Sequence, residues 1–226
     1  MQPVSKACAA IYAERQHAVI GVSPFNSYFS EERLRALFTW ANETFEAFHI
    51  FVPDTATRYT LEAVGYDPVR AKKKARRQCR YLLNKIERAI AYTAPELDMS
   101  IVLTGDILGA NNRYQSLLAH VERKFASDAD FKRQCLECSH WVLENQVEDV
   151  NSIDDSALMH AVKYLLAEMP LFMDSASIIG VSSSVFCYHQ CPAILRALYE
   201  DRSDGLIDEQ QGFLIVDEIA LAAQAA

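Results

Sequence analysis

Glycine and proline are scarce in this chain, with seven of each among 226 residues. Because sandwich and repeat architectures use these residues at their many turns, the shortage argues against such folds and favours long helices. The chain also lacks a run of about 18 apolar residues, so no segment is expected to span a membrane. Half of the residues are hydrophobic, as in ordinary globular proteins, and we expect one large domain over residues 1–226.

The N-terminal stretch lacks an apolar run followed by a small-residue cleavage site, so we expect no export signal and a cytoplasmic location. In that reducing compartment the six cysteines are expected as free thiols. Two pairs, Cys135 with Cys138 and Cys187 with Cys191, have spacings at which four thiolates could hold zinc. The first pair lacks the glycine or proline of a zinc knuckle, so buried thiols are favoured and no metal is expected.

Short apolar runs predict the strands. Three nearly continuous runs, 17–23, 48–54 and 99–105, are typical of strands covered on both faces. A fourth strand is expected in two pieces, 177–181 and 185–188, separated by three serines. Helical patterns cover 31–45, a segment that follows Asp67 and Pro68, 111–125, 130–146, 154–168 and 192–199. The alternation predicts an α/β fold with a mostly parallel, doubly wound sheet flanked by helices.

Positive charge is concentrated in one segment of the chain. Nine of the 22 lysines and arginines lie between Arg70 and Arg88, where Glu87 is the single acid. This segment carries a charge of +8 in a chain whose net charge is −8, so the other residues sum to −16. Its apolar residues have helical spacing, which leaves the cations on the remaining arc of a helix. Such a stripe suits a phosphate backbone, although a solvated surface helix explains the run alone equally well.

The first predicted strand ends at a serine. Ser23 lies three residues before Asn26, and no glycine-rich dinucleotide or phosphate-binding loop follows. A tight turn with a capping serine is the simpler explanation of this spacing alone. The carboxyl ends of parallel strands are nevertheless where α/β sheets bind ligands, so both side chains are candidates for a site.

Two further pairs of side chains could carry chemistry. Tyr164 and Glu168 are four residues apart and share one helix face, either as a surface pair or as a holder for an ammonium group. Tyr188 and His189 follow the last predicted strand and are expected at the same edge of the sheet as Ser23.

Taken together, the order and spacing of these groups resemble the cyclodipeptide synthases. The resemblance rests on Gly-Val-Ser-Pro-Phe-Asn-Ser-Tyr-Phe-Ser at 21–30, on 164–168 and 188–189, and on 205–208 and 211–214. It covers nearly the whole chain, and Asn26, Tyr188 and His189 resemble the subfamily named for Asn, Tyr and His (NYH). The resemblance implies a Rossmann-like domain similar to the catalytic domain of class Ic aminoacyl-tRNA synthetases. It also implies an enzyme that joins the amino acids of two aminoacyl-tRNAs into a 2,5-diketopiperazine.

The resemblance implies a role for each catalytic candidate. Ser23 would be the nucleophile of a ping-pong reaction and would carry first an aminoacyl and then a dipeptidyl group. Glu168, with the tyrosine one turn before it, would hold the α-ammonium group of the first amino acid. Tyr188 would transfer protons during ring closure, supported by Asn26 and His189. The activated ester carries the free energy, so no ATP, metal or other cofactor is expected.

The same resemblance implies contacts with the substrates. The acceptor arms of the two tRNAs would be held through phosphate contacts by Arg70, Lys73, Lys74, Arg77 and Arg80. The first amino-acid pocket is expected at Val19, Gly21 and Phe51, and its apolar character suits an uncharged amino acid. The second is expected at Cys138, Trp141, Val142, Asn145, Gln190 and Cys191.

Two other functions stay open at this point. A non-catalytic tRNA-binding module with a synthetase-like fold would keep the basic segment but would not need Ser23. An aminoacyl-tRNA deacylase would hydrolyse the ester and join nothing. No DNA partner is expected, the chain could be a monomer or a homodimer, and the pattern does not name the two amino acids.

Overall fold

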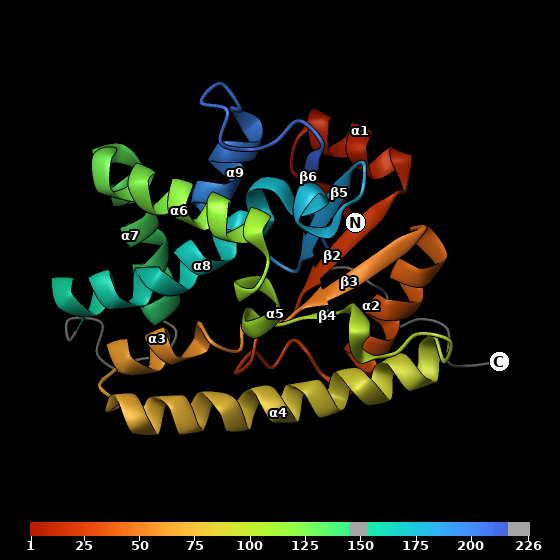
Figure 1. Ribbon diagram of the computed structural model, residues 1–226, viewed down its shortest axis with the longest axis horizontal. Helices are drawn as coiled ribbons and strands as arrows, with labels where there is room; N and C mark the ends of the chain where they lie inside the picture. The colour runs from red at the N-terminus through yellow and green to blue at the C-terminus, as the bar shows by residue number, and fades with distance from the viewer. Residues whose placement is uncertain (145–152, 217–226) are drawn as a thin grey trace.

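A six-stranded sheet with helices on both faces organises the chain (Figure 1). The computed structural model describes residues 1–144 and 153–216. The strands, in the order β1-β6-β5-β2-β3-β4, are β1 Gln2–Pro3, β6 Gln211–Ile215, β5 Ser184–Tyr188, β2 His17–Gly21, β3 Ala47–Phe51 and β4 Val102–Leu103. β1 is antiparallel to β6 and all other pairings are parallel, which confirms the predicted α/β fold.

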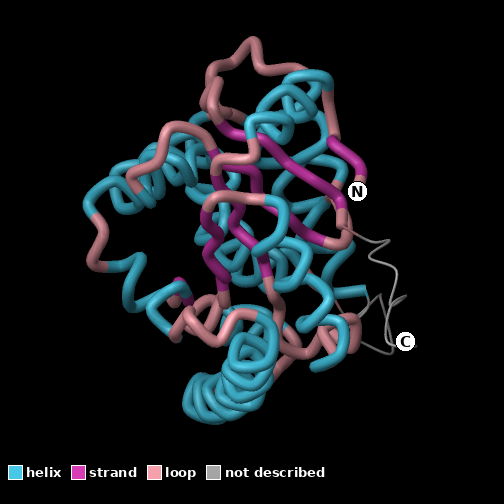
Figure 2. The backbone as a smooth tube through the Cα atoms, turned by 90° about the vertical axis from the view of Figure 1, so that its right-hand side faces the viewer, coloured by secondary structure: helices cyan, strands magenta, loops and turns pink. Residues whose placement is uncertain are grey.

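The helices cover the sheet in two layers, with the strands between them in Figure 2. They are α1 Lys6–Glu14, α2 Glu31–Thr44, α3 Thr57–Ala63, α4 Pro68–Thr93, α5 Gly105–Gly109, α6 Asn112–Ser127, α7 Ala129–Glu144, α8 Asp155–Ile179 and α9 Ala193–Glu200. Val19 of β2 joins the core formed with α6 to α9, whereas Ala18 and Ile20 join the core formed with α2 and α4. Within the described residues, no helix is long and apolar enough to cross a membrane.

The basic segment forms the long helix that the sequence predicts. Asp67 caps α4 by accepting hydrogen bonds from the backbone N–H groups of Val69 and Arg70, and Pro68 occupies the first turn. Ala71, Ala75, Cys79, Leu82, Ile86, Ala89 and Ile90 form its buried stripe. The cations therefore lie on the opposite arc of α4, the helix that runs along the lower edge of the molecule in Figure 1.

The expected strand at 177–181 is wrong. α8 does not end near 168 but continues to Ile179, where Gly180, at φ 90°, terminates it in a left-handed conformation. The isoleucines that suggested a strand are thus the last turn of a helix, because packing overrides the β propensity of a short apolar run. The predicted strand at 99–105 shortens for a local reason: Asp98 caps a 3₁₀ helix, Met99–Ile101, and only two residues remain for β4.

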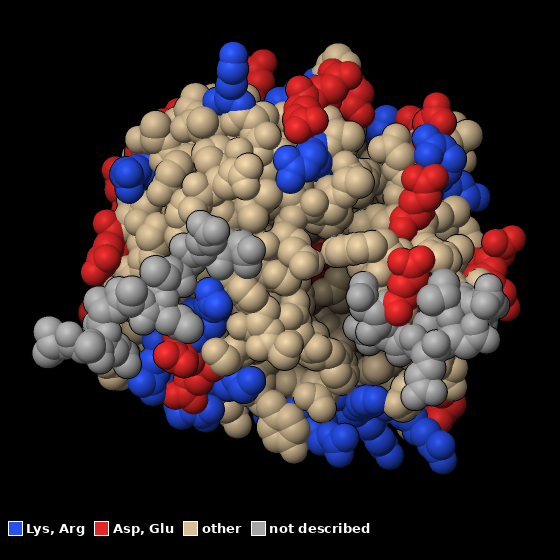
Figure 3. Space-filling view, turned by 180° about the vertical axis from the view of Figure 1, so that it is seen from behind, with Lys and Arg blue, Asp and Glu red and all other residues tan. Residues whose placement is uncertain are grey.

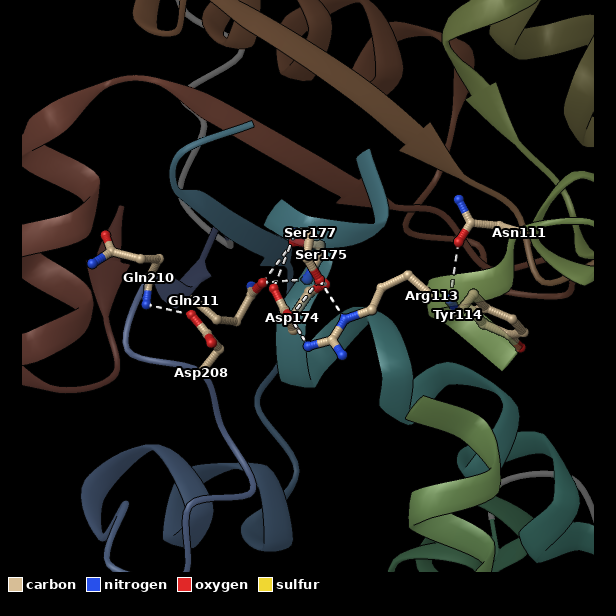
Figure 4. A network of polar contacts seen from close by, with 9 residues as sticks. All are labelled: Asn111, Arg113, Tyr114, Asp174, Ser175, Ser177, Asp208, Gln210 and Gln211. Atoms are coloured by element: carbon tan, nitrogen blue, oxygen red, sulfur yellow. Dashed lines mark hydrogen bonds and ion pairs between the residues drawn. The ribbon is translucent and has the colours of Figure 1, made fainter. Parts of the chain in front are cut away.

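α8 breaks its helical geometry at Asp174, where φ is −163° and ψ is 64°. The buried Asp174 carboxylate accepts the N–H of Ser177 at 3.0 Å and pairs with the guanidinium of Arg113 from α6 at 2.6 Å. The next residue, Ser175, donates its N–H and its hydroxyl to Oε1 of Gln211 in β6, each at 2.7 Å (Figure 4). This network ties the C-terminal end of α8 to α6 and to the sheet.

Candidate active site

The two central strands of the sheet lie at a topological switch point. From β2 the chain continues to β3 and β4 on one side, whereas β5 and β6 lie on the other. Ligands of doubly wound sheets bind at the carboxyl ends of strands at such a point. Ile20 of β2 pairs with Cys187 of β5, so Ser23 and Tyr188, which follow shortly after them, emerge at the same edge.

Hydrogen bonds fasten the loop after β2 to the end of β5. The hydroxyl groups of Ser23 and Tyr188 are 2.9 Å apart. The Asn26 side-chain amide donates to Nε2 of His189 at 2.9 Å, and its carbonyl oxygen accepts the backbone N–H of Tyr28 at 3.0 Å. The Tyr28 ring stacks on the His189 ring with 4.3 Å between centroids. The loop that carries Ser23 is therefore held by contacts with Tyr188 and His189 at the end of β5.

α8 contributes a half-buried carboxyl, Glu168, and a half-buried phenol, Tyr164, to the same place. Burial raises the pKa of Glu168 to about 8, against a smaller lowering by the hydrogen bond from Tyr164. Burial and the nearby charge of Glu168 raise the pKa of Tyr164 well above its ordinary value. Burial also raises the pKa of Tyr188 to about 12. Both phenols are thus neutral at pH 7, and an ammonium group placed beside Glu168 would favour the ionised carboxylate.

These six side chains, Ser23, Asn26, Tyr164, Glu168, Tyr188 and His189, line one pocket of about 550 Å³. Gly21 forms part of the pocket wall, next to the rings of Phe186 and Tyr188. A Cβ atom at this position would lie 2.8 Å from two ring atoms of Phe186 and 3.2 Å from Tyr188. The close approach of these rings explains why a glycine precedes the serine loop.

Of the residues expected in the two amino-acid pockets, some line the 550 Å³ pocket and others do not. Gly21, Cys138, Trp141, Val142 and Gln190 line the 550 Å³ pocket. Val19 and Phe51 lie beneath it in the core, and Cys191 packs against that core without lining the pocket. Asn145 lies outside the described residues.

Sequence reasoning missed one whole wall of the pocket. Thr57, Thr60 and Leu61 of α3 line it, as do Phe25, Phe172, Leu195 and Phe213. α3 has seven residues, and its N-cap, Ala56, makes no side-chain hydrogen bond, so neither a long hydrophobic pattern nor a capping residue marks the helix. Phe25 is marked only by its backbone conformation, a positive φ of 64°, which the sequence does not reveal.

The residues expected to bind tRNA lie on α4, below the pocket. Figure 3 shows lysine and arginine side chains along that edge of the molecule, with a hollow in the surface above them. Arg70, Lys73, Arg77 and Arg80 are exposed. Arg70 pairs with Asp67 at 3.3 Å, whereas the other three form no ion pair with a described residue. Lys74 is half-buried and donates a hydrogen bond to the hydroxyl of Tyr66.

Residues 1–218 match the sequence profile of the family described as cyclodipeptide synthase. The chain belongs to the cyclodipeptide synthase family. A cyclo(L-tyrosyl-L-tyrosyl) synthase from Mycobacterium tuberculosis is 31% identical, over 96% of this synthase and 75% of the relative. A cyclo(L-leucyl-L-leucyl) synthase from Staphylococcus haemolyticus is 28% identical, over 95% and 93% of the two chains. A cyclo(L-leucyl-L-phenylalanyl) synthase from Streptomyces noursei is 30% identical, over 93% and 88%.

Solved structures of the family have the same fold as this synthase. The Staphylococcus haemolyticus enzyme superposes with a TM-score of 0.84 at 25% identity, over 94% of this chain and 95% of that one. A Mycobacterium tuberculosis protein, whose structure relates cyclodipeptide synthetases to type I tRNA synthetases, superposes with a TM-score of 0.82 at 32% identity, over 95% and 90%. The expected likeness to class I synthetases is therefore confirmed, and the enzyme is a cyclodipeptide synthase with aminoacyl-tRNA substrates.

The cysteines of the synthase are all unpaired thiols. Burial raises the pKa of Cys135, Cys138 and Cys191 to about 12 and that of Cys187 further. Cys135 and Cys187 belong to the cores on opposite faces of the sheet. In the parts of the chain that the structure describes, no three His, Cys, Asp or Glu side chains gather into a metal site.

Proposed function

We propose that the synthase works by ping-pong catalysis with Ser23 as its nucleophile. The observation that carries the proposal is the 2.9 Å contact between the hydroxyls of Ser23 and Tyr188, inside a pocket that also holds Glu168. Because Tyr188 stays neutral, with a pKa raised to about 12, its hydroxyl can accept one hydrogen bond and donate another. The substrate is an activated ester, so the serine needs less activation than a protease serine does.

In the first half-reaction, Oγ of Ser23 bonds to the carbonyl carbon of the first aminoacyl ester. The bond from that carbon to the ribose oxygen breaks, and the serine proton ends on the ribose hydroxyl. Glu168 and Tyr164 hold the α-ammonium group during this step, which fixes the ester carbon beside the serine. Burial disfavours the free Glu168 carboxylate, so the charge pair forms with the correct substrate in place.

In the second half-reaction, the ammonium group of the Ser23-bound amino acid first gives a proton to the Glu168 carboxylate, whose pKa is raised to about 8. The resulting free amine attacks the ester of the second aminoacyl-tRNA. An amide forms, the second ribose oxygen leaves with the amine proton, and a dipeptidyl group remains on Ser23. The terminal amine of that dipeptide then attacks the Ser23 ester, which closes the ring and returns a proton to the serine. Tyr188, whose hydroxyl is within hydrogen-bond distance of the Ser23 hydroxyl, transfers this proton from the amine to the serine oxygen.

We also propose that the first amino acid is hydrophobic. The pocket walls include Leu165, Phe172, Phe186, Leu195 and Phe213, which bind an apolar side chain without an unpaired polar group. Relatives named for leucyl, tyrosyl and phenylalanyl products support this choice.

The NYH assignment is part of the same proposal. Its support is the hydrogen bond between Asn26 and His189, which couples two of the residues that name the subfamily, next to Tyr188. We further propose that residues 1–226 act as one domain, because the two cores share one sheet.

The test is Ser23→Ala, compared with the wild type and with Ser127→Ala, an exposed serine on α6. Intact-protein mass spectrometry after mixing with aminoacyl-tRNA should show an aminoacyl adduct on the wild type and on Ser127→Ala. Ser23→Ala should bind aminoacyl-tRNA but gain no adduct and release no diketopiperazine. A native rate of product formation by Ser23→Ala would refute the covalent route, and free amino acids as the wild-type product would indicate a deacylase.

A further inference from the structure

Phe25 holds an unusual conformation two residues after Ser23. Its φ is 64°, in the left-handed region that bulky residues rarely occupy, and the residue is 41% exposed. Strained residues persist where the surrounding structure fixes them, and they cluster at functional sites. Here the strained backbone presents an apolar ring at the mouth of the pocket that contains Ser23.

The ring of Phe25 faces the basic helix. Nζ of Lys74 lies 5.8 Å from its centroid and 4.2 Å from the centroid of Tyr66, whose hydroxyl accepts a hydrogen bond from this ammonium group. Among the described residues, no other aromatic ring packs on Phe25. Lys74 therefore joins the exposed ring to the line of cations on α4.

The proposed attack of Ser23 on the aminoacyl ester determines which part of the tRNA lies next to the Phe25 ring. An ester attacked by Ser23 is attached to the ribose of the terminal nucleotide, so the base on that ribose lies just outside the pocket. Two residues span at most about 7 Å, which puts Phe25 within side-chain reach of that base. Single-stranded nucleic acid binds proteins through base stacking on aromatic rings, with cations along the backbone.

We propose that Phe25 is a stacking platform for the 3′-terminal adenine of the aminoacyl-tRNA and that Lys74 contacts the phosphate before it. The inference rests on the proposed role of Ser23, because that role places the terminal ribose at the pocket mouth. Stacking of this base orients the ester without reading the amino acid, so it serves both tRNA substrates alike.

The experiment uses two substitutions of the full chain. Phe25→Asn removes the ring but keeps a residue that tolerates the left-handed region, and Phe25→Tyr keeps the ring. Acylation of Ser23 is measured with an aminoacyl-tRNA that the wild type accepts and with the cyanomethyl ester of the same amino acid, which lacks the nucleotide. We expect Phe25→Asn to lower kcat/KM for the aminoacyl-tRNA about ten- to a hundredfold, with the cyanomethyl ester unaffected and Phe25→Tyr near wild type.

Equal kcat/KM for wild type and Phe25→Asn with aminoacyl-tRNA would overturn the inference. An equal loss with both substrates would also overturn it, because Phe25 would then shape the amino-acid pocket or the serine loop. A second readout is inhibition by the trinucleotide CCA against its analogue with an abasic 3′ end. The wild type and Phe25→Tyr should prefer CCA, and Phe25→Asn should not. Failure of the wild type to form an aminoacyl-enzyme from either ester would instead refute the proposed function.

Discussion

At the residue scale, the half-buried carboxyl of Glu168 links the stability of the fold to pH. Its pKa rises to about 8 in the folded protein, chiefly through burial, from an ordinary value of 4.5. A group with a raised folded pKa contributes its full stability below the unfolded pKa and loses it as pH rises through the folded pKa. The window here runs from about 4.5 to 8, so at higher pH the ionised side chain destabilises the fold that it serves.

Glu168→Gln should therefore stabilise the synthase above pH 8 while it removes function. We expect its free energy of unfolding to exceed that of the wild type by about 2–4 kcal/mol at pH 8.5, since each pKa unit corresponds to about 1.4 kcal/mol. Urea unfolding measures this difference, with the exposed Glu209→Gln as a control. The same variant should lose the rising limb near pH 8 in kcat/KM for Ser23 acylation. Wild-type acylation by Glu168→Gln would contradict the ammonium-binding role.

Individual residues also mark the limit of sequence reasoning. The side chains of Ser23, Tyr164 and Glu168 meet in one pocket, as the resemblance to the cyclodipeptide synthases led us to expect. The left-handed backbone of Phe25 has no counterpart in composition or spacing, because a phenylalanine predicts an extended or helical conformation. The resemblance led us to expect Val19 in a pocket, but Val19 lies in the core, because it is in the middle of β2, two residues before the strand ends at Gly21.

At the scale of elements, α4 combines a buried apolar stripe with an exposed cationic arc. The apolar stripe packs α4 into a core that also contains residues of α2. This packing positions the helix, so its cationic side chains do not depend on ion pairs for their location. Lys73 and Arg77, one turn apart, form none with the described residues. Phosphate contacts release counterions, which makes the affinity of such a helix for RNA depend on salt.

The double substitution Lys73→Ala with Arg77→Ala should flatten that salt dependence. Each lost phosphate contact lowers the log-log slope of affinity against salt concentration by about one, so the pair should lower it by about two. Lys6→Ala with Arg123→Ala removes the same charge from exposed positions on α1 and α6 and should leave the slope unchanged. Filter binding or fluorescence anisotropy over a salt series measures both. An identical slope in the α4 variant would move the tRNA site to another surface.

Helices and strands with a long apolar pattern could be predicted from the sequence. Elements whose conformation depends on contacts with distant parts of the chain could not. α4 and β2 have strong apolar periodicity or continuity, and both lie where the sequence predicts them. β6 fills the sheet beside β5 although its segment suggested no strand, and β1 has two residues. The last turn of α8 has β-branched residues, yet the contacts of Asp174 and Ser175 hold it as a helix.

At the scale of the whole molecule, a buried polar chain joins three strands at the end of the sheet opposite Ser23. His17 of β2, 1% exposed, is 2.8 Å from the hydroxyl of Ser184 in β5 and 2.8 Å from Nδ1 of His49 in β3. Burial, with a smaller effect of His49, lowers the pKa of His17 to about 3. A lowered folded pKa gives stability that is present above the unfolded value, near 6.5, and is lost as pH falls toward 3.

His17→Asn should remove this acid sensitivity. Glu168 acts in the opposite direction between pH 4.5 and 6.5, so the measured quantity is the difference from the wild type. Relative to the wild type, the free energy of unfolding of His17→Asn should improve by about 1.4 kcal/mol for each pH unit from 6.5 down to 4.5. Urea unfolding at several pH values measures it, with His120→Asn, an exposed position, as the control. A constant difference across this range would show that His17 does not titrate with folding.

Which strands are neighbours could not be predicted from the sequence. The alternation of strand and helix gives a parallel sheet, but the placement of β5 beside β2 depends on how the two cores close. The placement of β5 beside β2 brings Tyr188 next to Ser23. The hydrophobic periodicity of the sequence does not predict this placement, so the site was identified through the family resemblance.

The contact between Ser23 and Tyr188 joins residues 165 positions apart in the chain, and this separation has a consequence for biosynthesis. A nascent chain emerges from the ribosome with its N-terminal part first. Ser23 and the whole of α4 precede β5 in the chain, so an incomplete chain presents its cationic helix before Ser23, the proposed nucleophile, can contact Tyr188. A product that terminates before residue 188 would thus carry the cationic surface without the contact between Ser23 and Tyr188, and both features are present together only after β5 is translated.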